Sequence, residues 1–567
     1  MNKRTVGLLV LLLFVLSCAQ VLAEGPDEGE DRGTVDRFLD TAAVPTEITM
    51  MAEIEEERPK PVLPAEQVSI KEVRVIGVTG LSEKEIAGII GPFQNAKLTG
   101  KDMQRCADQI TDTYALKGYL TSYAYVDPEK LSEGVLEVKA VEGKIGQITI
   151  EGNQYFSSDI YEKKLGFKEG DIVNYTSLRN NIYRINKNMD RKAKLELKAG
   201  QEPGLTDITV MVTDKLPYHF TFNYDNYGSF YILNNRYKAF FISNNLTGND
   251  DSISLKVQMT EADTHKLYDI DYFLPITNNL KWELYLMPYK MEDYEHERQY
   301  IDMEKRAQKT YSYLYYTLVD RPGCEIVANV GFVYKDILWY AYGARQKWDR
   351  FRAGLFGFDI NIADKWGRTI ISNDTEFGIP EIWGGAHRKN DYTSVTGARG
   401  DYKKTHFIFA RRQKLIDDIE LLLKSHLQLS SCTLTGVNGF SVGGFFGVID
   451  NRGYPRAQYE GDSGYSFTPS IAFPAYFVPR DVKVPFSKAK LYDSLKLFTF
   501  FDWAEAILKS PKEDKEKKRT LRSAGFGLTL NLPEAFSMRV DCAWPLDRTP
   551  PGDGDHFHTW VSMTKSF

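Results

Sequence analysis

Apolar and polar side chains alternate along most of the chain between Pro217 and Phe567. In SISLKVQMT (252–260), GFGLTLNL (525–532) and SMRVDCAW (537–544), large apolar residues occupy every second position, and polar, charged or small residues fall between them. About sixteen such segments of about ten residues, separated by polar turns, follow the pattern of transmembrane β-strands. A soluble sandwich also alternates, but it seldom sets charged residues opposite a large apolar face on so many strands. Because lipid tolerates no open sheet edge, we expect a mainly β protein whose residues 216–567 form a 16-stranded transmembrane antiparallel β-barrel.

The last segment, FHTWVSMTKSF (557–567), sets Val561, Met563 and Phe567 on one face and Ser562, Thr564 and Ser566 on the other. A terminal aromatic residue on an alternating strand resembles the assembly signal of outer-membrane barrels. Phe567 is therefore expected to be read by the barrel-assembly machinery. Lys565 departs from this signal, in which an aromatic or apolar residue is commoner.

Residues 66–215 contain a unit of one strand, two helices and two strands that occurs twice. In the longest predicted helix (99–119), Thr99 is a good N-cap, and one face is formed by Met103, Ala107, Ile110, Tyr114 and Leu116. The tandem order resembles the POTRA domain, most closely over ITIEGNQYFSSDIYEKKLGFKEGDIVN (148–174). The resemblance predicts two α+β POTRA domains, at 66–142 and 143–215.

The N-terminus has Lys3 and Arg4 before an apolar run, VGLLVLLLFVL (6–16). Eleven residues are too few to span a bilayer as a helix but suit the core of a signal peptide. Residues 1–23 are predicted to be that signal peptide, with cleavage after Ala23; a weak lipoprotein box ending at Cys18 is the alternative. Residues 24–65 hold twelve acidic against four basic residues and are expected to be a linker.

Net charge and cysteine spacing argue against two classes of function, nucleic-acid binding and metal binding by cysteines. The net charge of −6 argues against a nucleic-acid partner, which would require a basic face. The cysteines beyond the signal peptide lie far apart and match no metal-ligand spacing, which favours isolated thiols or at most one incidental disulfide: Cys106, Cys324, Cys432 and Cys542. No metal or other cofactor is expected.

Residues 461–464, Gly461-Asp462-Ser463-Gly464, are the sequence with which trypsin-like proteases present their nucleophile. That interpretation needs a histidine and an aspartate that precede the serine and converge on it. None of the eight histidines has a matching sequence context, and no Walker loop, Gly-x-Ser-x-Gly or HExxH motif occurs. We therefore expect no catalytic residue and no use of ATP, and a secreted serine hydrolase using Ser463 is kept as a disfavoured second alternative.

Arg452-Gly453-Tyr454, together with the two POTRA-like units and the barrel, resembles the two-partner-secretion translocators of the ShlB/FhaC type over residues 66–567. The resemblance implies a loop, about 431–464, that folds into the barrel with this triplet at its tip. Its implied flanks are Gly443 and Gly444 on one side and Gly461, Asp462, Ser463 and Gly464 on the other. The implied partner motif on the barrel wall is Phe500, Asp502 and Ala504, with Ala504 in place of a glycine.

Strand parity agrees with this partner motif, because Phe500, Asp502 and Ala504 share the face opposite Phe501 and Trp503. A carboxylate on the lumen face needs a partner, and a guanidinium can bind it through two parallel hydrogen bonds. We expect Arg452 to pair with Asp502 and to hold the loop inside the barrel.

The resemblance implies export, without ATP, of an unfolded secreted partner, expected to be a large β-repeat protein. The barrel would lie in the outer membrane, and the periplasmic POTRA domains would capture the partner by strand addition. Residues 35–43 are a candidate for the family's N-terminal plug helix. Periplasmic chaperones, the assembly machinery and outer-membrane lipid are further expected partners. An assembly factor of the same superfamily and a passive porin are the alternatives.

Overall fold

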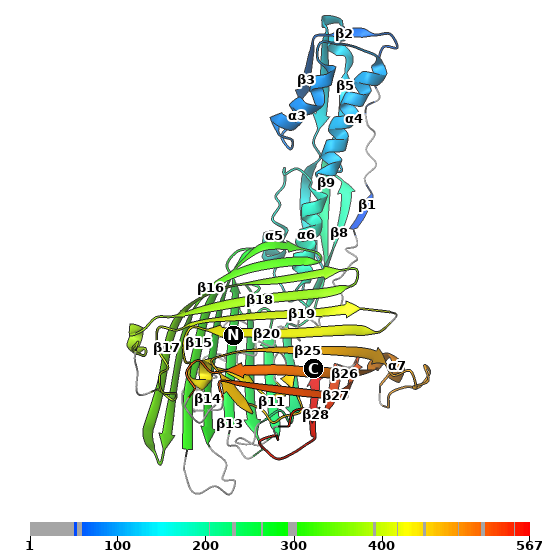
Figure 1. The fold of residues 1–567 in the computed structure, drawn as a ribbon. Helices are drawn as coiled ribbons and strands as arrows, with labels where there is room; N and C mark the ends of the chain where they lie inside the picture. Colours follow the sequence, from blue (N-terminus) through cyan, green and yellow to red (C-terminus); the bar gives the residue numbers. More distant parts are fainter. Residues whose placement is uncertain are drawn as a thin grey trace, which may run out of the picture. The chain divides into compact units, whose positions relative to one another are not determined.

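The computed structural model describes residues 50–53, 59, 61–202, 204–228, 234–261, 265–292, 303–388, 393–416, 418–445, 450–485, 487–511, 516–533, 535–548 and 550–567. The predicted signal peptide, Cys18 and the candidate plug helix lie outside these residues. Two compact units meet in the chain between Leu216 and Pro217. Figure 1 shows strands and helices together in the first unit and long strands in the second.

The first unit begins with a small domain of strands and helices. Its elements are β2 (Val68–Ile70), β3 (Glu72–Ile76), α3 (Glu83–Ile90), η1 (Gly91–Phe93), β4 (Ala96–Leu98), α4 (Gly100–Leu116), β5 (Tyr123–Asp127), η2 (Pro128–Glu133) and β6 (Val135–Val141). The sheet order is β3-β6-β5, with β3 and β6 parallel, and β2 pairs with β4. The helices and sheet enclose one apolar core.

Helix α4 begins where the sequence predicted. Thr99 and Asp102 form a capping box, and the predicted apolar face buries Met103, Ala107, Ile110 and Tyr114. Leu116 was wrongly placed on that face: it is 88% exposed, because a position two residues after Tyr114 lies about 200° around the helix, on the opposite side. Burial raises the pKa of the Cys106 thiol, on the same helix, to about 11, which keeps it protonated and unreactive.

A second domain repeats the order. Its elements are β7 (Lys144–Glu151), α5 (Ser158–Leu165), α6 (Tyr175–Asn186), β8 (Arg191–Ala199) and β9 (Leu205–Asp214). The sheet order is β1-β8-β9-β7, and its outermost strand, β1 (Met50–Glu53), comes from the acidic linker and runs parallel to β8. A separate apolar core lies between this sheet and its helices.

The second unit is a closed antiparallel barrel of sixteen strands, as predicted. The strands in barrel order are β10 (Tyr218–Asp225), β11 (Arg236–Ser243), β12 (Ser252–Thr260), β13 (His265–Pro275), β14 (Leu280–Glu292), β15 (Met303–Arg321), β16 (Cys324–Ala341), β17 (Ala344–Asp364), β18 (Gly367–Gly378), β19 (Lys403–Lys414), β20 (Glu420–Ser430), β25 (Ser463–Pro474), β26 (Leu495–Ile507), β27 (Lys518–Leu532), β28 (Phe536–Pro545) and β29 (His558–Ser566). Short helices η3 (Ile382–Gly384), η4 (Gly436–Asn438) and α7 (Leu491–Ser494) lie in its connections.

The barrel closes where β29 pairs with β10, in a register that sets Ser566 opposite Thr221. Phe567 follows directly: its backbone N–H donates to the Phe220 carbonyl, and its ring packs edge-on against Phe222. The Phe567 side chain is 70% exposed, so it remains accessible on the outer surface. Its role as an assembly signal stays a prediction.

Alternation sorts side chains between the two barrel faces. On β26, Phe500, Asp502 and Ala504 are buried, whereas Phe501 and Trp503 are more than one-third exposed. No helix of the described residues is long and apolar enough to cross a bilayer. Cys106, Cys324, Cys432 and Cys542 are all free thiols.

Candidate functional site

The connection between β20 and β25, residues 431–462, is the lumen loop. Its described part contains two small ribbons: β21 (Phe440–Val442) pairs with β24 (Tyr459–Gly461), and β22 (Gly444–Phe445) with β23 (Asp450–Asn451). Between β21 and β22 the backbone turns through Gly443 and Gly444, both at positive φ. A Cβ on Gly443 would lie 2.6 Å from the Pro455 carbonyl oxygen. The turn therefore requires glycine for both its conformation and its close packing.

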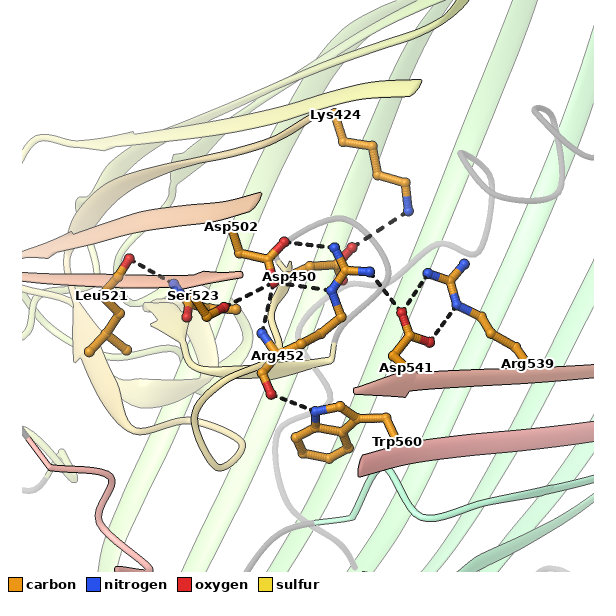
Figure 2. A network of polar contacts seen from close by, with 10 residues as sticks. Lys424, Asp450, Arg452, Asp502, Leu521, Ser523, Arg539, Asp541 and Trp560 are labelled. Atoms are coloured by element: carbon orange, nitrogen blue, oxygen red, sulfur yellow. Dashed lines mark hydrogen bonds and ion pairs between the residues drawn. The ribbon is translucent and has the colours of Figure 1, made fainter. Parts of the chain in front are cut away.

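Arg452, at the tip of this loop, is 1% exposed and carries the densest set of polar contacts in Figure 2. Its Nη2 and Nε donate to the two carboxylate oxygens of Asp502 at 2.7 and 3.0 Å, which is the bidentate pair that the resemblance and strand parity predicted. Its backbone N–H donates to the same carboxylate at 2.9 Å. Its Nη1 donates to Asp541 Oδ1 on β28 at 2.8 Å.

Each carboxylate has another partner. The Ser523 hydroxyl on β27 donates to Asp502 at 3.1 Å, and Arg539 donates to both oxygens of Asp541 at 2.7 and 2.9 Å. The two guanidinium groups and two carboxylates sum to zero charge. The guanidinium of Arg452 also stacks 3.3 Å above the Phe500 ring, so its face is desolvated by an aromatic surface.

Backbone contacts fix the same tip. Trp560 Nε1 on β29 donates to the Arg452 carbonyl at 2.7 Å, and Asn451 Nδ2 donates to the Leu521 carbonyl on β27 at 2.8 Å. Asp450 lies 3.7 Å from Lys424 Nζ of β20. Strands β26 to β29 all contribute contacts to the tip or to its carboxylate partners, and β20, which directly precedes the loop, contributes Lys424 (Figure 2).

Tyr454 of the tip motif and Ala504 of the wall motif pack in one buried apolar cluster. Tyr454 is buried in a cluster with Phe440, Ala504 and Leu521, and its hydroxyl donates to Asp547 at 3.3 Å. Ala504 is fully buried there, so its methyl group fills space that the family's glycine would leave open.

Gly453 lies against the backbone of β28, and replacing it with alanine is expected to displace the tip. An added methyl group would lie 2.6 Å from Ser523 Cβ and 2.7 Å from the Pro545 nitrogen. Such overpacking costs about 1–3 kcal/mol and moves the neighbouring backbone. We expect a higher open-pore conductance in planar bilayers for Gly453→Ala than for wild type. Gly354→Ala is the matched control, because no atom lies within 4 Å of the added methyl; equal conductance for the two variants would contradict the packing argument.

Residues 461–464 are the return of the lumen loop into β25. Asp462 accepts backbone N–H bonds from Leu434 and Lys509, both at 2.6 Å. Ser463 is 4% exposed, and its hydroxyl accepts the Ser430 N–H at 3.0 Å. A Cβ on Gly461 or Gly464 would lie 2.5 Å from the backbone of β26. Residues 461–464 therefore join the returning end of the loop to its first part, to β20 and to β26.

Four further residues belong to the site and were not predicted from the sequence: Asp541, Arg539, Ser523 and Trp560. The signal for two of them was present, because alternation in SMRVDCAW puts Arg539 and Asp541 on the polar face of one strand. Their proximity to Arg452 depends on the stagger between strands, which local alternation does not encode.

Family models of known proteins match both the barrel and the two domains that precede it. The model of the haemolysin secretion/activation protein ShlB/FhaC/HecB family matches residues 204–492, just over half of the chain. Residues 68–143 match the ShlB-type POTRA domain, and residues 143–213 match the POTRA model described as a surface antigen variable number repeat. The chain belongs to the ShlB/FhaC/HecB family.

Similarity to individual members of this family extends along the whole chain. The heme/hemopexin transporter protein HuxB of Haemophilus influenzae is 21% identical over 579 residues, covering 98% of both chains. Among solved structures, CdiB from Escherichia coli superposes with a TM-score of 0.72 at 19% identity over 95% of this chain and 96% of its own. CdiB from Acinetobacter baumannii gives 0.67 at 15% identity over the full length of both.

Membership establishes the general role. The chain is an outer-membrane β-barrel transporter of the two-partner secretion class, with N-terminal POTRA domains that are periplasmic in this family. Transporters of this class act on a secreted partner protein. The predicted family, fold class and location are therefore confirmed.

Proposed function

We propose that the chain exports an unfolded partner protein through its barrel without ATP, and that the lumen loop is the gate. The observation that carries this proposal is the neutral, buried ion cluster around Arg452. A buried ion pair adds little net stability, because desolvation of the charges offsets their attraction, but separating its members while they stay buried is costly. The loop therefore has one defined closed position, and it can leave that position when water enters the lumen and solvates the charges.

Directionality in this scheme comes from the partner itself. The sequence contains no nucleotide-binding motif, so the chain offers no evident route for coupling to ATP hydrolysis. A partner that folds outside the cell cannot return through the pore. Folding on the surface would then draw the remaining chain outward. Periplasmic chaperones, the barrel-assembly machinery and outer-membrane lipid complete the set of proposed partners.

Capture of the partner would use strand addition to the POTRA sheets. The edge strand β8 already carries a strand from the same chain, because Met50–Glu53 pairs with Leu195–Lys198. A partner segment that adds to β8 must first displace β1. The linker strand therefore acts as an intramolecular competitor for this edge.

Breaking the linker strand is expected to raise the affinity of the POTRA domains for an extended peptide. The double variant Met51→Pro, Ala52→Pro removes two backbone N–H donors of β1 and prevents its regular pairing with β8. We expect a severalfold tighter binding of a fluorescent peptide of alternating threonine and valine, measured by anisotropy on the full chain in detergent. Val62→Pro, at a 92% exposed position, is the control. Unchanged affinity in the double-proline variant would exclude β8 as the site.

The export proposal is tested by reconstitution. Purified chain is inserted into liposomes without nucleotide, and urea-unfolded partner protein is added on the POTRA side. Export is supported if the partner becomes protected from added protease in liposomes that contain the wild-type chain, and not in liposomes that contain Arg452→Ala. Insertion of other barrels into the same liposomes would instead favour the assembly-factor alternative. Labelling by a serine-reactive probe that is lost in Ser463→Ala would favour the hydrolase alternative.

A further inference from the structure

The first part of the lumen loop, residues 431–439, contacts a second set of charges, which has no side chain in common with the cluster around Arg452. Glu376 on β18 lies between Lys335 on β16 and Lys404 on β19, with nitrogen–oxygen distances of 3.4 and 3.1 Å. The Tyr402 hydroxyl donates to the other oxygen of Glu376 at 2.6 Å. All four side chains are 2% exposed or less, so this is a buried polar network of the barrel wall.

One residue of the loop completes this network. Lys335 Nζ donates to Asn438 Oδ1 at 3.0 Å, across 103 residues of sequence. Gln428 Nε2 on β20 donates at 3.0 Å both to the Asn438 carbonyl and to the Asp462 carbonyl, so it ties the outgoing and returning ends of the loop together. Asn438 is 1% exposed, as expected for a residue enclosed by the wall.

Apolar packing supports the same contact. Leu434 is buried in a cluster formed by the inward side chains of β15, β16 and β17 with Tyr402. The members of that cluster from the wall are Tyr311, Tyr313, Val333, Phe351, Ala353 and Leu355. The loop segment therefore covers an aromatic wall that would otherwise face the lumen.

We propose that two separate latches hold the lumen loop, and that Asn438 bound to the Lys335–Glu376–Lys404 network is the second. The two sets share no side chain: Arg452 binds β26, β28 and β29, whereas Asn438 binds, through Lys335, the network on β16, β18 and β19. The network carries a net charge of +1, and Asn438 contributes a neutral acceptor to it. Release of Arg452 alone would leave residues 431–439 in place, so a polypeptide-sized path requires both latches to open.

Thiol labelling measures release of the segment directly. All native cysteines are replaced by alanine and Leu434, which is 4% exposed, is replaced by cysteine as the reporter. The rate of its reaction with a water-soluble maleimide in detergent follows the fraction of molecules in which the segment has left the wall. A fast unboiled band on a gel, which slows on boiling, confirms that each variant is a folded barrel.

Asn438→Ala is expected to raise the labelling rate about tenfold, the effect of losing one hydrogen bond to a charged group. Arg452→Ala alone is expected to change it little, and the double variant to label faster than either. Asn329→Ala, the same change at a buried position on β16, is the control. Asn438→Asp, which neutralises the network, should label more slowly than the parent. Equal rates for Asn438→Ala and the control, or the full effect from Arg452→Ala alone, would overturn the second latch.

The role of the Asn438 contact in a gate rests on the proposed export function. The proposal that this contact holds the loop does not. The labelling assay contains no partner protein and reports only the position of the loop. Export by the same variants is measured separately in liposomes. Labelling as expected with unchanged export would refute the gate while leaving both latches in place.

Discussion

Arg452→Ala is expected to release the loop tip, to raise pore conductance and to abolish export of the partner protein. The change removes three side-chain hydrogen bonds and leaves the Asp502 carboxylate buried without its cation, with the backbone N–H of residue 452 and the Ser523 hydroxyl as its described donors. Removing one member of a buried ion pair costs about 3–5 kcal/mol when the site stays dry. The loop can avoid this cost by leaving the wall so that water reaches Asp502. Single-channel conductance in planar bilayers and protease protection of the partner in liposomes measure the two effects.

Two variants test whether the position and shape of the cation matter. Arg456→Ala removes the same charge four residues away, where the Arg456 Nη1 donates to the Tyr227 carbonyl at 3.2 Å. It should keep near-normal conductance. Arg452→Lys keeps the charge but lacks the planar fork that reaches Asp502 and Asp541 together, so an intermediate effect is expected. If Arg452→Ala and Arg456→Ala behave alike, the ion cluster does not hold the loop.

Much of this architecture could be read from the sequence because its signals are local. A period of two places Asp502, Arg539 and Asp541 on inward faces regardless of how the strands are arranged. A period near 3.6 and a capping residue locate α4, and the same period, applied strictly, excludes Leu116 from the buried face because it lies about 200° around the helix from Tyr114. The closed barrel follows from the number of alternating segments and from the absence of open edges in lipid.

The contacts that make the site depend on the register of strands distant in sequence. Asp502 lies opposite Ser523, and Ser523 opposite Pro545, so the directly facing residue of β28 is not Asp541. Only the stagger and tilt of the closed barrel bring Asp541 to the second side of the guanidinium. The Lys335–Asn438 contact is likewise set by how the loop folds back. Neither contact has a sequence signature short enough to recognise.

Charge balance in the cluster leads to a stronger test than a single removal. Asp541→Ala should be nearly as damaging as Arg452→Ala, because it removes the carboxylate that lies between Arg452 and Arg539 (Figure 2) and leaves two guanidinium groups with Asp502 as the one carboxylate of the cluster. Arg539→Ala alone leaves two carboxylates around one guanidinium. Removing Arg539 and Asp541 together restores a neutral Arg452–Asp502 pair. The double variant should therefore be less impaired than Asp541→Ala, although it lacks one more charged side chain.

The comparison is a double-mutant cycle on the free energy of unfolding, measured from the urea dependence of the fast unboiled band. Residues that share one ion network show coupling energies of about 0.5–3 kcal/mol, whereas independent sites add within about 0.5 kcal/mol. Coupling of the larger size, with partial recovery of low conductance in the double variant, means that neutrality of the whole cluster holds the tip. Additive losses would mean that Arg539 and Asp541 act independently, so that the Arg452–Asp502 pair, rather than neutrality of the whole cluster, holds the tip.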